Sequence, residues 1–402
     1  MEECPDARID AAATAAGGLP DDALVEILSR VPARSIHRFK CVSKYWRDLI
    51  ADPLHRKRLP QTLEGFFFFS DDAGAVCRGR FISLPGRSAP HIDPSFSFLT
   101  KQPGIENLNL LGSCNGLLLF ERGSNQATAP DFAVCNPATE QWVAVPGCPL
   151  DPPTDSYFTY LIFDPAVSPH FRLVHFWQKD YFAEIEVRSF SSETMVWSTD
   201  MASQHGRWRD EGGWKKWVNG GATLSPTWGS AFVNGMLHLV IYHAIEEYMI
   251  VALDMEGKVC RVITWPDERS CHPFVGQSQG RLHFVGVLAE RGERARLKWA
   301  GPGLSIWVLE DYDTEEWVLK HRVSYLELFG EMNSLDGFRN AVFAIHPDRN
   351  LIFILQDSNQ KLISYDMDSK ELHAFHTLEH NSEFCTPYVP NFLESSVLTN
   401  EH

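Results

Sequence analysis

The sequence predicts two parts, a small all-α module of three to four helices followed by a large all-β propeller of about six blades. Apolar residues with helical spacing mark the region before residue 63, and extended helical periodicity is scarce after it. From residue 63 onward the apolar runs are short and rich in Val, Ile, Phe, Trp and Tyr, with Gly, Asn, Asp and Pro between them. Such runs are typical of short strands joined by tight turns. A pattern that recurs about every 50–55 residues in this second part has the size of a propeller blade.

The chain has 402 residues, which is long for one ordinary domain. We expect a disordered Ala-rich tail over residues 1–17, the helical module over 18–62, the propeller over 63–396 and a second tail over 397–402. Hydrophobic residues make up 44% of the chain and aromatic residues 12%, which is enough for a folded core.

The helical module begins with an apolar stripe at positions i, i+3, i+4 and i+7 of one helix. The stripe consists of Leu24, Ile27, Leu28 and Val31. Pro20 suits the first helical position, and Pro32 ends the helix. Ser35 can cap a second helix and Ser43 a third. These two helices carry Ile36, Phe39, Tyr45, Trp46, Leu49 and Ile50. So short a segment cannot bury all of these side chains by itself, and a partner surface is expected to cover the rest.

The segment Leu19–Pro53 resembles an F-box. The family pattern has Leu-Pro, two acidic or polar residues, an apolar stripe and Leu/Val-Pro, followed by a basic helix with Phe, Cys-Val, Lys and Trp, then Leu-Ile and Asp-Pro. The matching residues are Leu19-Pro20, Asp21-Asp22, Leu24, Ile27, Leu28, Val31-Pro32, Arg38-Phe39, Cys41-Val42, Lys44, Trp46, Leu49-Ile50 and Asp52-Pro53. A generic helical cap with the same stripe is the alternative.

The resemblance implies docking on a Skp-family adaptor, and through it on the cullin and RING subunits of a ubiquitin ligase. The residues that it assigns to adaptor binding are Leu19, Pro20, Leu24, Ile27, Leu28, Val31, Pro32, Ile36, Phe39, Val42 and Trp46. They are expected to be buried partly within the module and partly on the adaptor.

Two short motifs recur in the second part of the chain. In the first, a turn with Gly or Asn leads into an apolar strand, as at Asn115-Gly116, Asn234-Gly235, Gln279-Gly280 and Arg349-Asn350. The second is a polar turn between two strands, with copies at Cys135–Trp142, Phe190–Trp197, Leu253–Val259, Glu310–Trp317 and Tyr365–Leu372. Trp142 and Trp197 lie 55 residues apart, but Trp197 and Val262 lie 65 apart. An insertion of ten residues is therefore expected after Trp197.

A unit of about 50 residues with about four strands is closest to the kelch type of propeller blade. Five copies are legible, and Phe66–Leu84 can supply a sixth. The region resembles the kelch-like F-box-associated domain common in plant F-box proteins. Cys135–Trp142 matches its C-N-P-x-T-x-x-W element, and Phe384–Ser395 resembles its closing segment. A pair of β-sandwiches is the alternative fold, although a repeat that continues through the whole region favours the propeller.

The formal net charge of −16 is unevenly distributed. Residues 19–62 carry nine Lys and Arg against five Asp and Glu, so residues 63–402 are strongly acidic. Acidic surfaces repel phosphates, which argues against nucleic-acid binding. Acidity suits a basic protein partner, although it is also an ordinary route to solubility.

Several features indicate the cytosol or nucleus. The nine cysteines form no C-x-x-C pair and no cluster with zinc spacing, as in a reducing compartment with free thiols. The first ten residues are acidic and do not resemble a signal peptide. No uncharged apolar run reaches the length of a membrane span.

The sequence offers no catalytic, cofactor or metal site. It lacks a nucleophile elbow, a phosphate loop, an H-E-x-x-H motif and a dinucleotide fingerprint. The pairs His238/His243 and His373/His376 have odd spacing, which puts their members on opposite faces of a strand. We therefore expect a non-catalytic protein without a cofactor.

Two insertions are candidates for substrate recognition. The first, Ser203–Gly221, holds Trp208, Trp214 and Trp217 among basic residues, and Trp and Arg are enriched at interface hot spots. Packing of these tryptophans on the blades, or disorder of the loop, is the alternative. The second, Ala289–Gly303, is expected to be a solvated charged loop.

Taken together, these features predict a substrate-recognition subunit of a Skp-cullin-F-box ubiquitin ligase, with an unidentified protein substrate on the propeller and no nucleic-acid or membrane partner. One alternative is a propeller that senses a small molecule or glycan and couples it to degradation. Another is a cullin-independent scaffold that binds the adaptor alone.

Overall fold

The computed structural model contains two compact units, Met1–Thr62 and Leu63–His402. The structure describes residues 19–31, 33–40, 42–52, 55, 63–69, 79–85, 92–103, 105, 107–123, 131–149, 156–165, 167–178, 185–198, 222–243, 247–255, 259–266, 270–288, 290–291, 297–298, 303–329, 340–356, 359–378, 384–391 and 395–399. The first unit is helical, and the second is built from antiparallel sheets.

The helical unit has three described helices, α1 (Asp21–Leu28), α2 (Ala33–Lys40) and α3 (Lys44–Ala51). Pro20 is the N-cap of α1, and its carbonyl oxygen accepts the N–H groups of Ala23 and Leu24. Ser43 caps α3 as predicted, because its hydroxyl accepts the N–H of Trp46 at 3.2 Å. Ser35, however, lies inside the first turn of α2, so the prediction that it caps this helix is wrong.

One apolar cluster holds the three helices together. Its buried members are Leu24, Val25, Leu28, Ile36, Leu49 and Ile50. The predicted stripe on α1 differs at one position, since Val25 is buried instead of Ile27, which is 52% exposed. The hydroxyl of Tyr45 on α3 donates to Asp21 Oδ1 at 2.6 Å and ties the start of α1 to α3.

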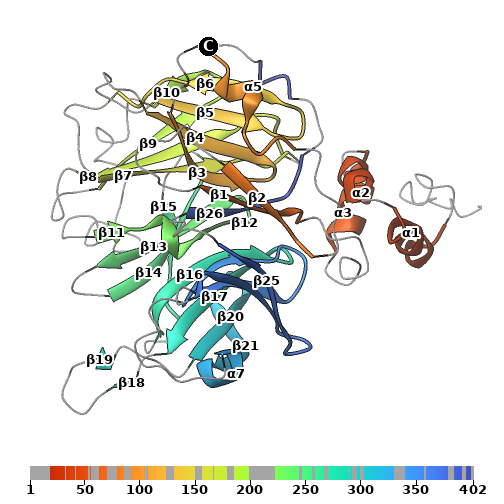
Figure 1. Ribbon diagram of the computed structural model, residues 1–402, viewed down its shortest axis with the longest axis vertical. Coiled ribbons are helices and arrows are strands. Elements are labelled where there is room, and N and C mark those ends of the chain that lie inside the picture. Colours follow the sequence, from red (N-terminus) through yellow and green to blue (C-terminus); the bar gives the residue numbers. More distant parts are fainter. Residues whose placement is uncertain are drawn as a thin grey trace, which may run out of the picture. The chain divides into compact units, whose positions relative to one another are not determined.

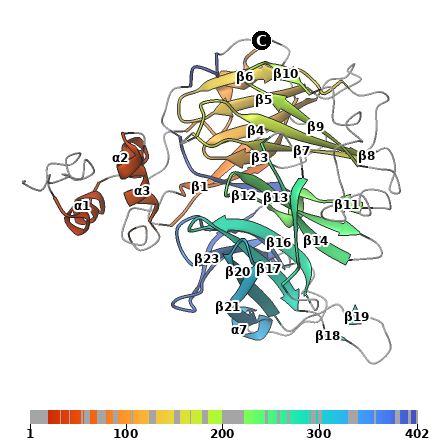
Figure 2. The same cartoon turned by 180° about the vertical axis from the view of Figure 1, so that it is seen from behind.

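The second unit is a propeller of six sheets arranged around a common centre (Figures 1 and 2). Five blades are antiparallel sheets in chain order. Blade 1 contains β3 (Asn107–Cys114), β4 (Leu117–Gly123), β5 (Asp131–Asn136) and β6 (Gln141–Val145), and blade 2 contains β7 (Ser156–Ile162), β8 (Arg172–Gln178), β9 (Ile185–Ser191) and β10 (Val196–Trp197). Blade 3 contains β11 (Ala222–Leu224), β12 (Ser230–Val233), β13 (Met236–His243), β14 (Glu247–Leu253) and β15 (Val259–Ile263). Blade 4 contains β16 (Ser270–Ser278), β17 (Arg281–Leu288), β20 (Gly303–Asp311) and β21 (Glu316–Ser324), and blade 5 contains β22 (Asn340–Ile345), β23 (Leu351–Gln356), β24 (Lys361–Asp366) and β25 (Leu372–Thr377).

The sixth blade joins the two ends of the propeller sequence. Strand β1 (Gly65–Phe69) lies between β2 (Gly79–Ser83) and the last strand, β26 (Phe384–Tyr388). β1 and β26 pair in an antiparallel register in which Phe67 is opposite Thr386. The dark blue β26 beside the orange β1 in Figure 1 marks this closure. The six-bladed propeller predicted from the sequence is confirmed, and the β-sandwich alternative is wrong.

The smaller elements lie between these strands. They are α5 (Ser97–Thr100), η1 (Pro226–Trp228), the hairpin of β18 (Glu290–Arg291) and β19 (Leu297–Lys298), and α7 (Tyr325–Phe329). The turn η1 splits the first strand of blade 3, so β11 and β12 pair with different parts of β13. Beside this break Gly229 bridges Val275, and a Cβ on Gly229 would lie 2.3 Å from the Val275 carbonyl oxygen.

Six apolar clusters lie between neighbouring blades, one at each of the six interfaces. The phenylalanine run of strand β1 fills the apolar clusters on both faces of its sheet. Phe66 and Phe68 enter the cluster shared with blade 5, whereas Phe67 enters the cluster shared with blade 1. Both faces of a propeller sheet are buried, so adjacent side chains on one strand can all be apolar.

The two recurring sequence motifs are the turns of two different hairpins. Asn115-Gly116, Asn234-Gly235 and Gln279-Gly280 join the first and second strands of their blades, and all six residues have positive φ. Positive φ at both central residues defines the type I′ turn, which favours Asn-Gly. The second motif joins the third and fourth strands, with Glu140, Met195, Glu315 and Lys370 in the left-handed region.

The tryptophan at the end of the second motif links neighbouring blades in two places. Trp197 Nε1 in blade 2 donates to the carbonyl oxygen of Pro146 in blade 1 at 2.7 Å. Trp317 Nε1 in blade 4 makes the corresponding bond to the Thr264 carbonyl oxygen after blade 3 at 3.0 Å. Both bonds run from a tryptophan in the last strand of one blade to a carbonyl oxygen just after the last strand of the preceding blade.

The chain after β26 also packs on blade 1. Asn136 Nδ2 donates to the Asn391 carbonyl oxygen at 2.8 Å, and Gln141 Nε2 donates to the Ser395 carbonyl oxygen at 3.2 Å. Leu398, which the sequence analysis placed in a terminal tail, is 2% exposed and joins the cluster between blades 1 and 2. The C-N-P-x-T-x-x-W element thus binds the segment that follows the last strand.

Candidate functional sites

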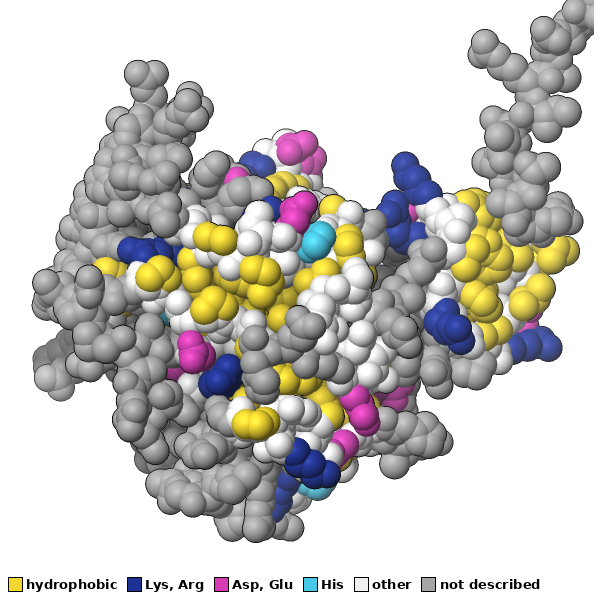
Figure 3. Space-filling view, turned by 90° about the horizontal axis from the view of Figure 1, so that it is seen from above, with side chains coloured by type: hydrophobic (Ala, Val, Ile, Leu, Met, Phe, Trp, Pro, Cys, Tyr) yellow, Lys and Arg dark blue, Asp and Glu magenta, His cyan; other side chains and the backbone are white. Residues whose placement is uncertain are grey.

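The helical unit exposes apolar side chains that its own core leaves uncovered. Leu19 is 47% exposed, Ile27 52% and Val42 64%. They lie before α1, on α1 and between α2 and α3. The helical unit at the right of Figure 3 carries many apolar side chains on its visible face. Exposed apolar side chains on so small a unit are typical of an interaction surface.

The residues predicted to bind the adaptor fall into three groups. Leu24, Leu28 and Ile36 are buried in the helical core. Val31, Phe39 and Trp46 are partly buried against it, and the rings of Phe39 and Trp46 lie 5.4 Å apart. Leu19, Pro20, Ile27 and Val42 are exposed. Pro32 lies outside the described residues. The sequence pattern therefore could not distinguish core residues from surface residues, because both are apolar.

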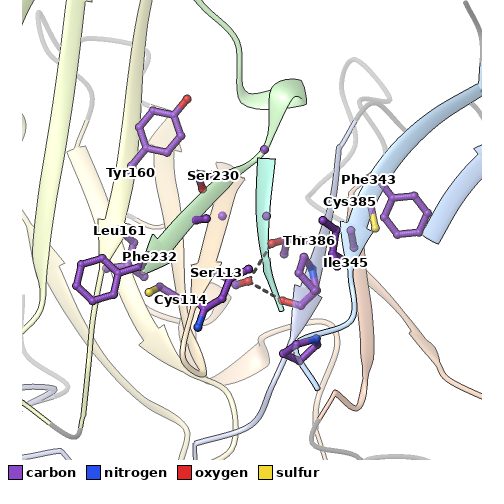
Figure 4. A pocket seen from close by; sticks show the side chains of 18 of the residues that line it. Ser113, Cys114, Tyr160, Leu161, Ser230, Phe232, Phe343, Ile345, Cys385 and Thr386 are labelled. Carbon is purple, nitrogen blue, oxygen red and sulfur yellow. Dashed lines mark hydrogen bonds between the residues drawn. The ribbon is translucent and has the colours of Figure 1, made fainter. Parts of the chain in front are cut away.

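The propeller contains a central cavity of about 320 Å³. The innermost strand of every blade contributes to its wall, namely β3, β7, β12, β16, β22 and β26. Its apolar wall residues include Leu111, Leu161, Phe232, Phe274, Phe343 and Ile345. Figure 4 shows Phe232, Leu161, Phe343 and Ile345 around this space. Ligand pockets in proteins typically begin at about 300 Å³.

One part of the cavity wall is polar, and most of its polar side chains already form hydrogen bonds within the protein. Ser113 Oγ on β3 donates to the carbonyl oxygen of Pro387 at 2.5 Å, and it lies 3.0 Å from Thr386 Oγ1 on β26 (Figure 4). Next to it Asn115 Nδ2 donates to the Phe163 carbonyl oxygen at 2.6 Å. These bonds connect blade 1 to blades 6 and 2 and fix the geometry of the wall.

The described residues of the cavity wall include no Asp, Glu, Lys, Arg or His. Two cysteines reach it, and burial raises the pKa of Cys114 to about 12 and that of Cys385 well above its usual value. Both thiols are therefore neutral at physiological pH. A thiol of this kind is unreactive, since the thiolate is the nucleophile.

A row of aromatic side chains on blade 3 is a second candidate surface of the propeller. This aromatic row consists of Trp228, Tyr242, Tyr248 and Trp265, all of them partly exposed. Tyr248 is central, with ring centroids 5.5 Å from Trp228, 4.9 Å from Tyr242 and 5.3 Å from Trp265. Tyr and Trp are enriched at binding hot spots. This row could not be predicted from the sequence, because its members come from four separate segments.

The predicted recognition residues Trp208, Trp214 and Trp217 lie outside the described part of the chain. Their insertion nevertheless ends at β11, where Thr223 is paired with Tyr242 of the aromatic row. Of the second insertion, only the β18–β19 hairpin and Gly303 are described.

Two of the four histidines considered as metal ligands, His238 and His373, have other contacts. His238 is fully buried, with Nε2 2.7 Å from Tyr312 Oη and Nδ1 3.3 Å from the Ala231 carbonyl oxygen. His373 and His376 are exposed, and His373 lies 3.4 Å from Glu371. Within the described ranges no group of three or more His, Cys, Asp or Glu is placed to hold a metal ion. No described helix is both long and apolar enough to cross a membrane.

Comparison with known families matches both units. The F-box domain family matches residues 18–58. The family described as "F-box protein At3g26010-like, beta-propeller" matches residues 82–396, which is most of the chain.

Curated relatives from Arabidopsis thaliana match over similar lengths. F-box protein At5g49610 is 25% identical over 365 residues, covering 87% of this chain and 89% of its own. F-box protein At5g07610 is 25% identical over 308 residues, covering 71% and 68%. F-box/kelch-repeat protein At3g23880 is 22% identical over 333 residues, covering 77% and 85%.

Proposed function

Because this chain belongs to the F-box proteins with an At3g26010-like β-propeller, we propose that it is the substrate-recognition subunit of a Skp-cullin-F-box ubiquitin ligase. The observation that carries this proposal is the exposed apolar surface of the helical unit, formed by Leu19, Ile27 and Val42. An F-box domain implies a Skp-type adaptor as the partner that covers such a surface.

In this role the chain contributes no catalytic group of its own. Binding both the adaptor and a substrate holds a substrate lysine near the charged ubiquitin carrier and raises its effective concentration. The ligase chemistry then belongs to the partners. The expected location in the cytosol or nucleus stays a prediction.

Adaptor docking is tested by placing a carboxylate on the exposed surface of the helical unit. Ile27→Asp and Val42→Asp should each weaken binding of a purified Skp-family adaptor at least tenfold in calorimetry, because a buried unpaired charge is costly. The melting temperature should stay unchanged, since both side chains are exposed. Val167→Asp, at a propeller residue that is 79% exposed, is the matched control.

The outcome that contradicts the proposal is adaptor binding by both Ile27→Asp and Val42→Asp with the affinity of the original chain. Leu28→Asp is less informative, because Leu28 is 1% exposed in the helical core and its replacement should unfold the unit. Recovery of the adaptor without cullin in complexes purified from cells would favour a cullin-independent scaffold.

For the protein substrate, we propose the blade-3 side of the propeller. The aromatic row lies there, and the insertion with Trp208, Trp214 and Trp217 ends at β11 beside it. When the proteasome is inhibited, substrate proteins should accumulate in complexes captured with the full chain. Tyr248→Ala should abolish the capture of these proteins, and so should joint replacement of the three tryptophans by Ala. If both variants retain the same proteins as the original chain, the substrate binds elsewhere. Leu326→Ala, at an exposed apolar residue of α7 in blade 4, is the control.

A further inference from the structure

We propose that the central cavity of the propeller is a binding site for a small, uncharged and mainly apolar molecule that carries one or two hydroxyl or carbonyl groups. This site is separate from adaptor docking and from the aromatic row. It is formed by the innermost strands of all six blades.

The charge of the wall selects the ligand class. Charged residues make up 22% of the chain, yet none of the wall residues that the structure describes is Asp, Glu, Lys, Arg or His. An ion that entered would lose its hydration without gaining a counter-charge, which costs far more than moving a neutral molecule. Phosphates, carboxylates and amines are therefore disfavoured, whereas Phe232, Phe274 and Phe343 offer apolar contact.

Polar groups remain available to orient a neutral ligand. Ser113 and Thr386 are already hydrogen-bonded to each other's strands. Among the described residues, no side-chain hydrogen bond is recorded for Ser230 or Gln277, which also line the cavity. A serine hydroxyl and a carboxamide can each donate and accept a bond. One or two such bonds in an apolar pocket are the usual basis of ligand orientation.

Gly112 shows that the cavity has room beyond its wall atoms. A Cβ built on Gly112 has no heavy atom within 4 Å, and the residue does not have a left-handed φ. At Gly276, on the opposite part of the wall, a Cβ would lie only 3.0 Å from Ile345 Cδ1. A larger side chain at position 112 can therefore extend into the cavity without forcing the backbone to move.

The test compares two fluorescent probes that differ in one charged group, N-phenyl-1-naphthylamine and its sulfonated analogue 8-anilinonaphthalene-1-sulfonate. The full chain should bind the neutral probe with one saturable site, and the anionic probe at least tenfold more weakly. Gly112→Leu should weaken binding of the neutral probe at least tenfold by filling the cavity. Ser230→Lys should reverse the preference, because it places a cation in the wall.

Two controls separate binding from misfolding. Each variant should keep the melting temperature and adaptor affinity of the original chain. Leu326→Lys, at an exposed residue that does not line the cavity, should leave both probe affinities unchanged. The proposal is overturned if the neutral probe does not bind, which means that the cavity holds only water. It is equally overturned if Gly112→Leu binds the neutral probe as well as the original chain, or if both probes bind alike.

Discussion

The side-chain amide of Gln141 accepts a 2.8 Å hydrogen bond from the backbone N–H of Ser395 and donates one to the carbonyl oxygen of the same residue. A second bond from Gln141 Nε2 reaches the Leu398 carbonyl oxygen at 3.4 Å. The two partners are 254 residues apart in sequence. Blade 1 thus fastens the chain that follows the last strand.

Replacing Gln141 by Ala should loosen this fastening. Loss of the hydrogen bonds of this side chain is expected to lower the free energy of unfolding by about 1–3 kcal/mol. The backbone amides of Ser395 and Leu398 should exchange their hydrogens faster than in the original chain, whereas exchange in β4 should stay unchanged. Gln277→Ala is the matched control, because it also removes a glutamine side chain, but one that makes no hydrogen bond to a described residue. Its free energy of unfolding should stay within about 0.5 kcal/mol of that of the original chain. Unchanged exchange in Gln141→Ala would contradict the assigned role.

Gly116 and Gly235 occupy equivalent turns but should respond differently to alanine. Gly235 has φ +74 and open space around its Cβ position, so Gly235→Ala costs only backbone strain of about 1–2 kcal/mol. Gly116 has φ +92, and a Cβ there would lie 2.4 Å from Asn391 Cβ. Gly116→Ala should therefore cost about 1–3 kcal/mol more. Urea unfolding of both variants measures the difference, and equal costs would show that Asn391 does not pack on this turn.

The two bonds between blades that start from tryptophan should differ in strength. Trp197→Phe removes the donor to Pro146 at a residue that is 5% exposed, and the carbonyl loses its partner. The expected loss is about 1–2 kcal/mol. Trp317 is only partly buried, so water can replace its indole N–H after Trp317→Phe. Its loss should be smaller, about 0.5 kcal/mol. Denaturant midpoints at constant slope test this order, which a larger effect at Trp317 would contradict.

Three buried histidines should make the propeller less stable in mild acid. Burial lowers the pKa of His175, His238 and His283 to about 4, compared with about 6.5 in an unfolded chain. Between these values the unfolded state binds more protons, so stability falls as the pH decreases. The loss is fully developed below about pH 4, where both states are protonated. From pH 7 to pH 5 it amounts to about 2 kcal/mol for each histidine.

A histidine variant separates this effect from the titration of the many carboxylates. His283→Gln should reduce the difference in unfolding free energy between pH 7 and pH 5 by about 2 kcal/mol. Leu326→Gln, at an exposed residue without a titratable group, should not change that difference. If both variants have the pH dependence of the original chain, His283 is not buried in its neutral form.

The parts of the fold that could be predicted are those that follow from short-range or repeated sequence patterns. The Asn-Gly turns and the recurring tryptophans each report a short-range or repeated geometry, so the six-bladed propeller was accessible from the sequence. The break between β11 and β12 was not, because it depends on the close approach of Gly229 to Val275 from the next blade. The exposure of Ile27 also could not be predicted, since its spacing fits the same stripe as that of Leu28. The cavity wall depends on six strands from distant parts of the chain, and no local pattern reports such convergence.

The sixth blade has a consequence for biosynthesis. Its central strand β1 begins at Gly65, but its partner β26 begins at Phe384. At a synthesis rate of about 5–20 residues per second, the edge of β1 waits roughly 15–60 s for its partner to leave the ribosome. During that time a run of phenylalanines remains on a strand with one unpaired edge, which is a template for aggregation. Nascent chains of this protein should therefore depend on chaperones until the last blade closes, and the F-box emerges on the ribosome well before the ring that it serves is complete.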